Sequence, residues 1–453
     1  MSVGNTNEPE LLDVAARIAE MAEGEEQVEA YVARSTSTSV KAYGGEVESL
    51  TQASSAGVGV RVIVDHREGF AYAGTLDEDV VLEALAEARD NAQFGEPDEF
   101  NGLATPDGVD AVDLDLWPEG LAAVPTADKV AMAIELEAAT TRRDPRVSGV
   151  RVAMYSDALG EGAVATSTGI RSWGRAGTSY LMVQALAQQD GETQIAGGLS
   201  VGREVTDLSI DEAADDAVLR STRLLGSAKP ATQRLTLVLE PRMTATVLGL
   251  VGGMLNGEAV LKGRSPFADR VGEAIASPLL TFVDDPTDAR SLGAESHDGE
   301  GLARRRNELV VDGVLQGFLH NTYTGRRSGT ASTGSAARGL ASTPGVGAAA
   351  LAVAPGAGTH DEVLGAVEHG LFVTSMAGLH SGVNPVSGDF SVGVEGLMVK
   401  GGELAEPIRE ATIASTLQRL LLDIAAVGAD LEWLPDGTGG VTLVIPDVAL
   451  SGS

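Results

Sequence analysis

The stretch 235–267, LTLVLEPRMTATVLGLVGGMLNGEAVLKGRSPF, constrains the fold more than any other segment of this chain. It opens with an apolar alternating run, Leu235–Glu240, which predicts a buried strand. Pro241 ends this strand because it has no N–H to donate to a ladder. The following segment, Thr244–Glu258, has no charged residue before Glu258, and its apolar side chains cover more than one helical face. We therefore expect a helix that is buried nearly all round and held by tertiary packing.

Alternating apolar residues predict an antiparallel meander over residues 28–72. Gly44-Gly45 and His66-Arg67-Glu68 mark its turns. Gly57 and Gly59 within it indicate a bend or a close approach of another backbone.

The remaining pattern is a mixture of helices and strands that predicts an α+β fold with antiparallel and mixed sheets flanked by helices. Residues 147–205 read as several strands, and Glu308–His320 as a hairpin with an Asp312-Gly313 turn. A boundary near 226–234 predicts two domains, 1–228 and 229–453, the second with the central helix and a curved antiparallel sheet. Helical periodicity predicts the following helices: Pro9–Met21, Asp77–Ala92, Ala127–Thr141, Ser209–Leu225, Asp361–Gly370 and Ala411–Val427.

The composition excludes several classes of function. The 453 residues carry a formal net charge of −33, which repels nucleic-acid phosphates and argues against direct DNA binding. There is no cysteine, so disulfides and thiolate chemistry are excluded, and a reducing, cytoplasmic location is expected. The N-terminus lacks a signal-peptide pattern, and no apolar run suits a membrane span.

Four motifs in order resemble the TldD/PmbA metallopeptidase-like family, also called modulators of DNA gyrase. They are GVGVRVIVDHREGFAYAG (57–74), LKGRSPFADRVGEAIASPLLTFVDD (261–285), HNTYTGRRSGTASTGSAARG (320–339) and SGVNPVSGDFSVGVEG (381–396). The resemblance spans nearly the whole chain. It implies the fold of that family.

The resemblance also implies where a metal would sit. The catalytic branch of the family carries His-Glu-x-x-x-His on the helix after the strand, and those places fall here on Leu248, Gly249 and Gly253. A cysteine ligand of that branch is also missing. The sequence therefore resembles the metal-less PmbA/TldE branch, and we expect no family-type metal, no cofactor and no catalytic residue. A separate cluster, such as His320 with His380, stays open, although lone histidines are more often structural.

The resemblance implies that the segments His320–Arg327 and Asn384–Asp389 lie towards an inner cavity. Both are polar and turn-rich, so they are candidate peptide-facing or cavity-facing regions. Arg326 and Arg327 could pair with acidic peptide groups or offset the acidic surface. Gly325–Gly347 is Gly/Ser-rich but lacks a P-loop pattern. A Ser/His/Asp set near 380–389 lacks a nucleophile elbow. The candidate residues are His320, Asn321, Tyr323, Arg326, Arg327, Asn384, Ser387 and Asp389.

These observations favour a metal-free, non-catalytic subunit that pairs with a TldD-like zinc peptidase acting on unfolded or modified peptides. The alternatives are a stand-alone homodimeric peptide-binding scaffold and an autonomous serine or aspartate hydrolase. Whether the isolated chain is an enzyme stays open. Neither nucleic acid nor a membrane is expected as a partner.

Overall fold

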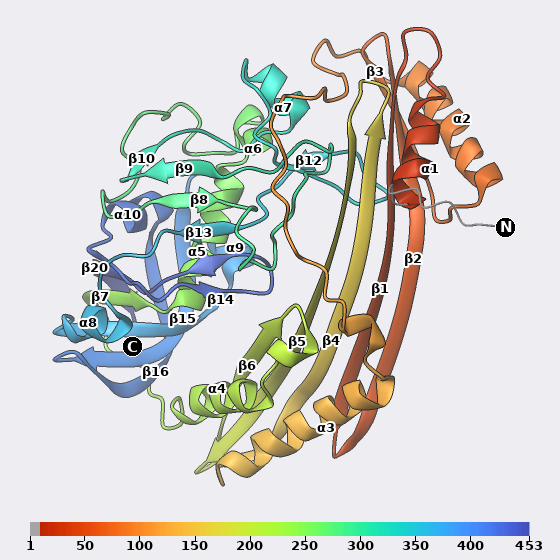
Figure 1. The fold of residues 1–453 in the computed structure, drawn as a ribbon. Helices are drawn as coiled ribbons and strands as arrows, with labels where there is room; N and C mark the ends of the chain where they lie inside the picture. Colours follow the sequence, from red (N-terminus) through yellow and green to blue (C-terminus); the bar gives the residue numbers. More distant parts are fainter. Residues whose placement is uncertain (1–9, 453) are drawn as a thin grey trace.

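The N-terminal half of the chain forms one long, curved antiparallel sheet (Figure 1). The computed structural model describes residues 10–452, and Pro9, the first residue of the predicted N-terminal helix, lies outside them. The meander predicted over residues 28–72 is confirmed as β1, β2 and β3. The strand order is β3-β2-β1-β4-β5-β6, with β1 (Gln27–Tyr43), β2 (Glu46–Val64), β3 (Arg67–Ala73), β4 (Val147–Thr166), β5 (Arg171–Gln189) and β6 (Glu192–Gly202).

Helices cover one face of this sheet, and the other face turns toward the C-terminal half (Figure 1). Because side chains alternate along β1, Val28, Ala30 and Val32 share a buried cluster with the first two helices, while Val40 and Ala42 share one with the next two. The helical elements are α1 (Glu10–Ala19), α2 (Glu78–Phe94), α3 (Thr126–Arg143) and α4 (Ile210–Thr222), with short 3-10 turns at Leu121–Ala123 and Val205–Asp207.

The C-terminal half contains two further six-stranded sheets and a small two-stranded one. The first has the order β16-β15-β14-β7-β20-β17, with β7 (Gln233–Leu239), β14 (His369–Ala377), β15 (Asp389–Lys400), β16 (Glu403–Thr416), β17 (Ala426–Val427) and β20 (Leu443–Ser451). The second has the order β10-β9-β8-β13-β19-β18, with β8 (Phe282–Asp284), β9 (Asn307–Val311), β10 (Val314–Leu315), β13 (Leu351–Val353), β18 (Glu432–Trp433) and β19 (Gly439–Gly440). The small pair is β11 (Ala336–Ala337) with β12 (Gly345–Val346).

Helices join these sheets into one large apolar core. Helix α5 contacts strands of both six-stranded sheets. The predicted α+β class with mixed sheets is confirmed, since most strand pairs are antiparallel while β7–β14 and β13–β19 are parallel. Within residues 10–452, no helix is long and apolar enough to cross a membrane. The C-terminal helices are α5 (Pro241–Met254), α6 (Gly257–Leu261), α7 (Thr322–Arg327), α8 (His360–Gly365), α9 (Leu379–Gly382) and α10 (Leu417–Leu422).

Helix α5 is buried on one side and open on the other. Pro241 stands in its first turn, and Leu248 and Val251 lie in the core. Gly249 and Gly253 are exposed, and a Cβ added at either position would meet no atom within 4 Å. The expectation of a helix buried nearly all round is therefore wrong for this face. The glycines here mark an open surface, because no other backbone packs against them.

The helix predicted over Ala411–Val427 forms only in part. Residues 411–416 continue β16, which pairs with β15 and also with β20. Helix α10 begins at Leu417 and ends at Leu422. The apolar spacing suited a helix, but pairing with two neighbouring strands holds the first part extended, as tertiary context commonly overrides local propensity.

Candidate functional site

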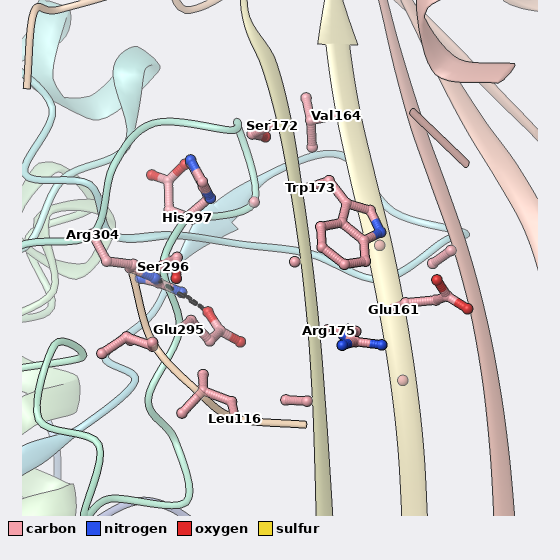
Figure 2. Close-up of a pocket in the computed structure, with 18 of the residues that line it drawn as sticks. Leu116, Glu161, Val164, Ser172, Trp173, Arg175, Glu295, Ser296, His297 and Arg304 are labelled. Carbon is pink, nitrogen blue, oxygen red and sulfur yellow. Dashed lines mark hydrogen bonds and ion pairs between the residues drawn. The ribbon is translucent and has the colours of Figure 1, made fainter. Parts of the chain in front are cut away.

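A cavity of about 1090 Å³ lies between the N-terminal sheet and the C-terminal half. Strands β1, β4 and β5 and the segment 111–117 form one part of its wall, and the C-terminal segments 294–299 and 336–340 form the other. Figure 2 shows Trp173 and Arg175 on the strand side, with Glu295 and Arg304 across from them. The volume is that of a pocket for a drug-sized or larger ligand.

Stacked aromatic and cationic side chains line this cavity. The guanidinium carbon of Arg175 lies 4.9 Å from the ring centroid of Trp117 and 5.8 Å from that of Trp173. The guanidinium carbon of Arg338 lies 5.0 Å from the ring centroid of Tyr31. Cations within about 6 Å of a ring face are attracted by its quadrupole. These contacts give the wall fixed, amphipathic surfaces that suit binding.

Charged residues of the wall are mostly neutralised by pairing. Arg304 donates from Nη2 to Glu295 Oε2 at 2.6 Å, a pair that Figure 2 draws as a dashed line. Burial lowers the pKa of His297, which keeps this ring neutral at neutral pH. The cavity thus offers stacking and polar contacts, and Nδ1 of its histidine, His297, has no hydrogen-bond partner among the described residues.

A buried ionic cluster beside the cavity joins the two halves of the chain. Glu29 of β1 accepts a hydrogen bond from Arg61 Nη2 of β2 at 2.9 Å, and it also pairs with Arg338 from the C-terminal half. Burial opposes ionisation of Glu29, but Arg61 and Arg338 outweigh it and lower its pKa. Glu300 lies next to the same Arg61, with 3.8 Å between Oε1 and Nη2. All four side chains are buried.

Close contact of the two halves also requires glycine on β2. A Cβ at Gly59 would stand 2.6 Å from the carbonyl oxygen of Leu340. The predicted close backbone approach at Gly59 is confirmed.

The predicted site residue Arg326 holds a loop of the N-terminal half. Its Nη1 donates to the carbonyl oxygen of Gly102 at 2.8 Å, and its Nη2 donates to that of Leu103 at 2.7 Å. Burial lowers the pKa of Arg326. The guanidinium is therefore occupied by backbone carbonyls in this structure.

Tyr323 and Arg327 take part in the same contact, whereas His320 and Asn321 form hydrogen bonds within the C-terminal half. His320 and Asn321 are buried, and Asn321 caps α7 through its side-chain oxygen. The hydroxyl of Tyr323 donates to Asp98 Oδ2 at 2.8 Å, and Arg327 Nη1 donates to the Tyr323 oxygen at 2.7 Å. We name this contact between α7 and residues 98–103 the α7 joint.

The predicted residues Asn384, Ser387 and Asp389 form a separate, exposed turn. Ser387 donates from Oγ to Asp389 Oδ2 at 2.6 Å, and Asn384 and Asp389 line a hollow of about 510 Å³. Across residues 10–452, no hydrogen bond links His380 to Ser387 or Asp389, so no Ser–His–Asp chain forms there. Neither predicted segment lines the large cavity, and the turn with Asn384 and Asp389 borders a different hollow.

The residues of the large cavity were missed from the sequence, because they come from several segments that lie far apart in the chain. The composition contained one clue to the cavity. Trp117 and Trp173, which line it, are two of only three tryptophans in the chain. Large aromatic side chains are frequent at binding surfaces.

Comparison with known proteins decides the family. Residues 28–92 match the model of PmbA/TldA metallopeptidase domain 1, residues 119–225 that of the central domain, and residues 232–452 that of the C-terminal domain. The chain belongs to the PmbA/TldD family. Metalloprotease PmbA of Escherichia coli O157:H7 is 26% identical over 437 residues, covering 96% of this chain and 94% of that protein.

Other members extend the comparison. The metalloprotease TldD homolog of Haemophilus influenzae is 24% identical over 88% of this chain and 87% of its own length. The crystal structure of TldE from Thermococcus kodakarensis superposes with a TM-score of 0.87, at 22% identity, over 94% of this chain and 97% of that one. This TldE therefore shares the fold.

The PmbA/TldD family name implies a metal, and α5 tests whether these residues fit one. Leu248 is buried in the apolar core, and Gly249 and Gly253 have no side chain. Protein ligands of zinc are thiolate, imidazole or carboxylate groups. No group of three or more potential ligands gathers anywhere within residues 10–452. The residues on α5 do not fit a metal.

Proposed function

We propose that this chain is a metal-free, non-catalytic subunit of a TldD-type zinc peptidase complex that acts on unfolded or modified peptides. The observation that carries the proposal is the open face of α5, where Gly249 and Gly253 stand at places that the family resemblance assigns to metal ligands. A chain that keeps the whole family fold without this chemistry is suited to binding. Membership of a family that includes TldD and TldE proteins supports a related subunit as partner.

The turn with Asn384, Ser387 and Asp389 is our candidate peptide-facing or partner-facing surface. It is exposed, it borders a hollow, and it enters the rigid strand β15. Rigid elements that present polar loops are the usual arrangement of binding sites. We place the complex in the cytoplasm, which fits a chain without cysteine.

A second candidate function is a stand-alone homodimeric peptide-binding protein. The cavity of about 1090 Å³ favours it, because this space is formed by residues of a single chain. Light scattering of the purified chain, with and without a TldD-type subunit, separates the two candidates. A mixed complex supports the first, and a homodimer that ignores the zinc subunit supports the second.

Metal content and hydrolysis by the isolated chain test the non-catalytic assignment. After mild chelation and incubation with zinc, we expect far less than one zinc per chain and no cleavage of unfolded peptides. About one tightly held zinc per chain would contradict the metal-free assignment. Cleavage without metal would instead favour an autonomous hydrolase.

A further inference from the structure

The carboxyl group of Glu300 occupies an unusual place at the α7 joint. Its side chain is 1% exposed. Its Oε2 accepts hydrogen bonds from the backbone N–H and the hydroxyl of Thr322, the first residue of α7, at 2.8 and 2.7 Å. Its Oε1 lies 3.8 Å from Arg61 Nη2, which is too long for a hydrogen bond. The group is therefore buried without a cation in direct hydrogen-bonded contact.

The nearby cations are already engaged by other carboxylates. Arg61 donates to Glu29 at 2.9 Å and reaches Glu68 at 3.4 Å, and Arg338 pairs with Glu29. The carboxyl group of Asp298, on the same loop as Glu300, accepts backbone hydrogen bonds from Glu300, Leu302 and Ala336. The charged groups that act directly on Glu300 are Arg61, Asp298 and Arg326. Around these lie Glu29 and Glu68, which contact Arg61, Arg338, which pairs with Glu29, and Arg304, which acts on Asp298.

Burial makes the ionised form of Glu300 costly in the closed joint. An ionised carboxylate that leaves water loses several kcal/mol unless close partners repay it. Burial and the neighbouring carboxylate of Asp298 raise the pKa of Glu300 above its ordinary value of 4.5, against the attraction of Arg61. Any arrangement that returns Glu300 to water returns its pKa toward that ordinary value. By linkage, proton binding favours the closed joint, and a rise in pH favours an open one.

The joint that Glu300 holds has a structural consequence. Helix α7 begins at Thr322. Its residues Tyr323 and Arg326 form hydrogen bonds with residues 98–103 of the N-terminal half. Arg61 lies on β2 of the N-terminal sheet. Glu300 therefore touches both sides of the contact next to the large cavity.

We propose that Glu300, Arg61 and the first turn of α7 form a proton-operated latch between the two halves of the chain, closed while Glu300 is protonated and loosened when it ionises. The latch is independent of the proposed subunit role. It would widen the cavity between the halves above neutral pH.

Pulsed dipolar electron paramagnetic resonance on the full chain tests this latch. Because the chain has no cysteine, Glu87→Cys on α2 and Gln316→Cys after β10, both exposed positions, carry two spin labels without background. We expect the distance distribution to be narrow at pH 6 and to broaden or lengthen at pH 8.5. The same labelled chain with Glu300→Gln should keep the narrow distribution at both pH values.

Two results would overturn the latch. One is an unchanged distance distribution between pH 6 and 8.5 in the double-labelled chain that keeps Glu300. This result alone would be sufficient. The other is a folded Glu300→Gln chain that still shows the full change. Glu68→Gln is the matched control, since Glu68 also faces Arg61 but is 30% exposed, and it should leave the response in place.

Discussion

Arg326 donates from Nη2 to the carbonyl oxygen of Leu103 at 2.7 Å, across the contact between the C-terminal helix α7 and a loop of the N-terminal half. A second bond from its Nη1 reaches the carbonyl oxygen of Gly102. A guanidinium with these partners holds the two halves together, and its predicted pairing with acidic peptide groups, or with the acidic surface, stays a prediction.

Replacement of Arg326 should therefore cost stability. Arg326→Ala removes the donors of two carbonyl groups, and we expect a loss of about 1–3 kcal/mol in the free energy of unfolding. Arg290→Ala is the control, because Arg290 is an exposed arginine that pairs with Asp288 of its own turn. Urea unfolding of both variants measures the difference. Equal free energies of unfolding for the two variants would show that the Arg326 contacts do not stabilise the fold.

The two sides of α5 should respond in opposite ways to an added methyl group. Gly249→Ala adds a Cβ to an exposed, open helical position, and we expect a gain of about 0.5–1 kcal/mol. Gly252→Ala places its Cβ 2.3 Å from Leu351 Cδ1, and we expect a loss of about 1–3 kcal/mol through overpacking. Melting temperatures of the pair give the test. A large loss in both would restore the expectation of a helix buried all round.

His360 should make stability depend on pH. A hydrogen bond to Asp430 raises the pKa of His360 above its ordinary 6.5, against partial burial. This contribution is fully present below pH 6.5 and is lost as the pH rises through the folded-state pKa. We therefore expect His360→Gln to lose more stability at pH 6 than at pH 8.5 in urea unfolding. The same loss at both pH values would mean that the imidazolium is not favoured by Asp430.

Asp430 contributes in the opposite direction. Hydrogen bonds from His360 and Thr442 overcome its desolvation and lower its pKa to about 2. That stability is present above pH 3.8 and is lost as the pH falls toward 2, so it does not confuse the comparison between pH 6 and 8.5.

Breaking the buried ion pair between α4 and the start of α5 should lower the free energy of unfolding strongly. Arg220 donates from Nη1 and Nη2 to Glu240, at 2.7 and 3.0 Å, and Glu240 is 4% exposed. Arg220→Ala leaves a buried carboxylate without its main partner, which typically costs about 3–5 kcal/mol. Arg142→Ala, which removes an exposed pair with Glu135, should change the free energy of unfolding by less than about 1 kcal/mol. Similar losses would argue that water already reaches Glu240.

Local patterns were enough to predict much of the fold. The meander over residues 28–72 follows from strict alternation and from turns such as Gly44-Gly45, both of which act over a few residues. The Asp312-Gly313 hairpin follows from turn chemistry in the same way. The helix predicted over Ala411–Val427 failed in its first turns because β15 and β20, both distant in sequence, pair with that segment.

The contacts around the large cavity form almost entirely between residues that are far apart in the sequence. Glu29 and Arg338 are 309 positions apart, and no local signal links them. Arg326 shows the same limit, because its partners are carbonyl oxygens more than 200 positions away and carry no side-chain signature. The sequence analysis did not single out Trp117 or Trp173, although the scarcity of tryptophan in this chain was a clue that it could have used.

The exposed turn at Asp389 can be separated from the stability effects above. Asp389→Ala removes an exposed carboxylate, and we expect an unchanged melting temperature but slower peptide cleavage by the complex with a TldD-type subunit. Glu87→Ala on the outer face of α2 is the control and should change neither. Lower stability without a specific loss of cleavage would assign Asp389 to the turn itself, through its bond with Ser387.

Partner-dependent hydrolysis tests the central claim most directly. Cleavage of an unfolded peptide is measured for this chain alone, for a zinc-loaded TldD-type subunit alone, and for their mixture at equal total concentration. We predict that this chain alone is inactive and that the mixture cleaves much faster than the zinc subunit alone. Cleavage by this chain alone, or a mixture no faster than the zinc subunit, would contradict the assignment as a metal-free subunit of the complex.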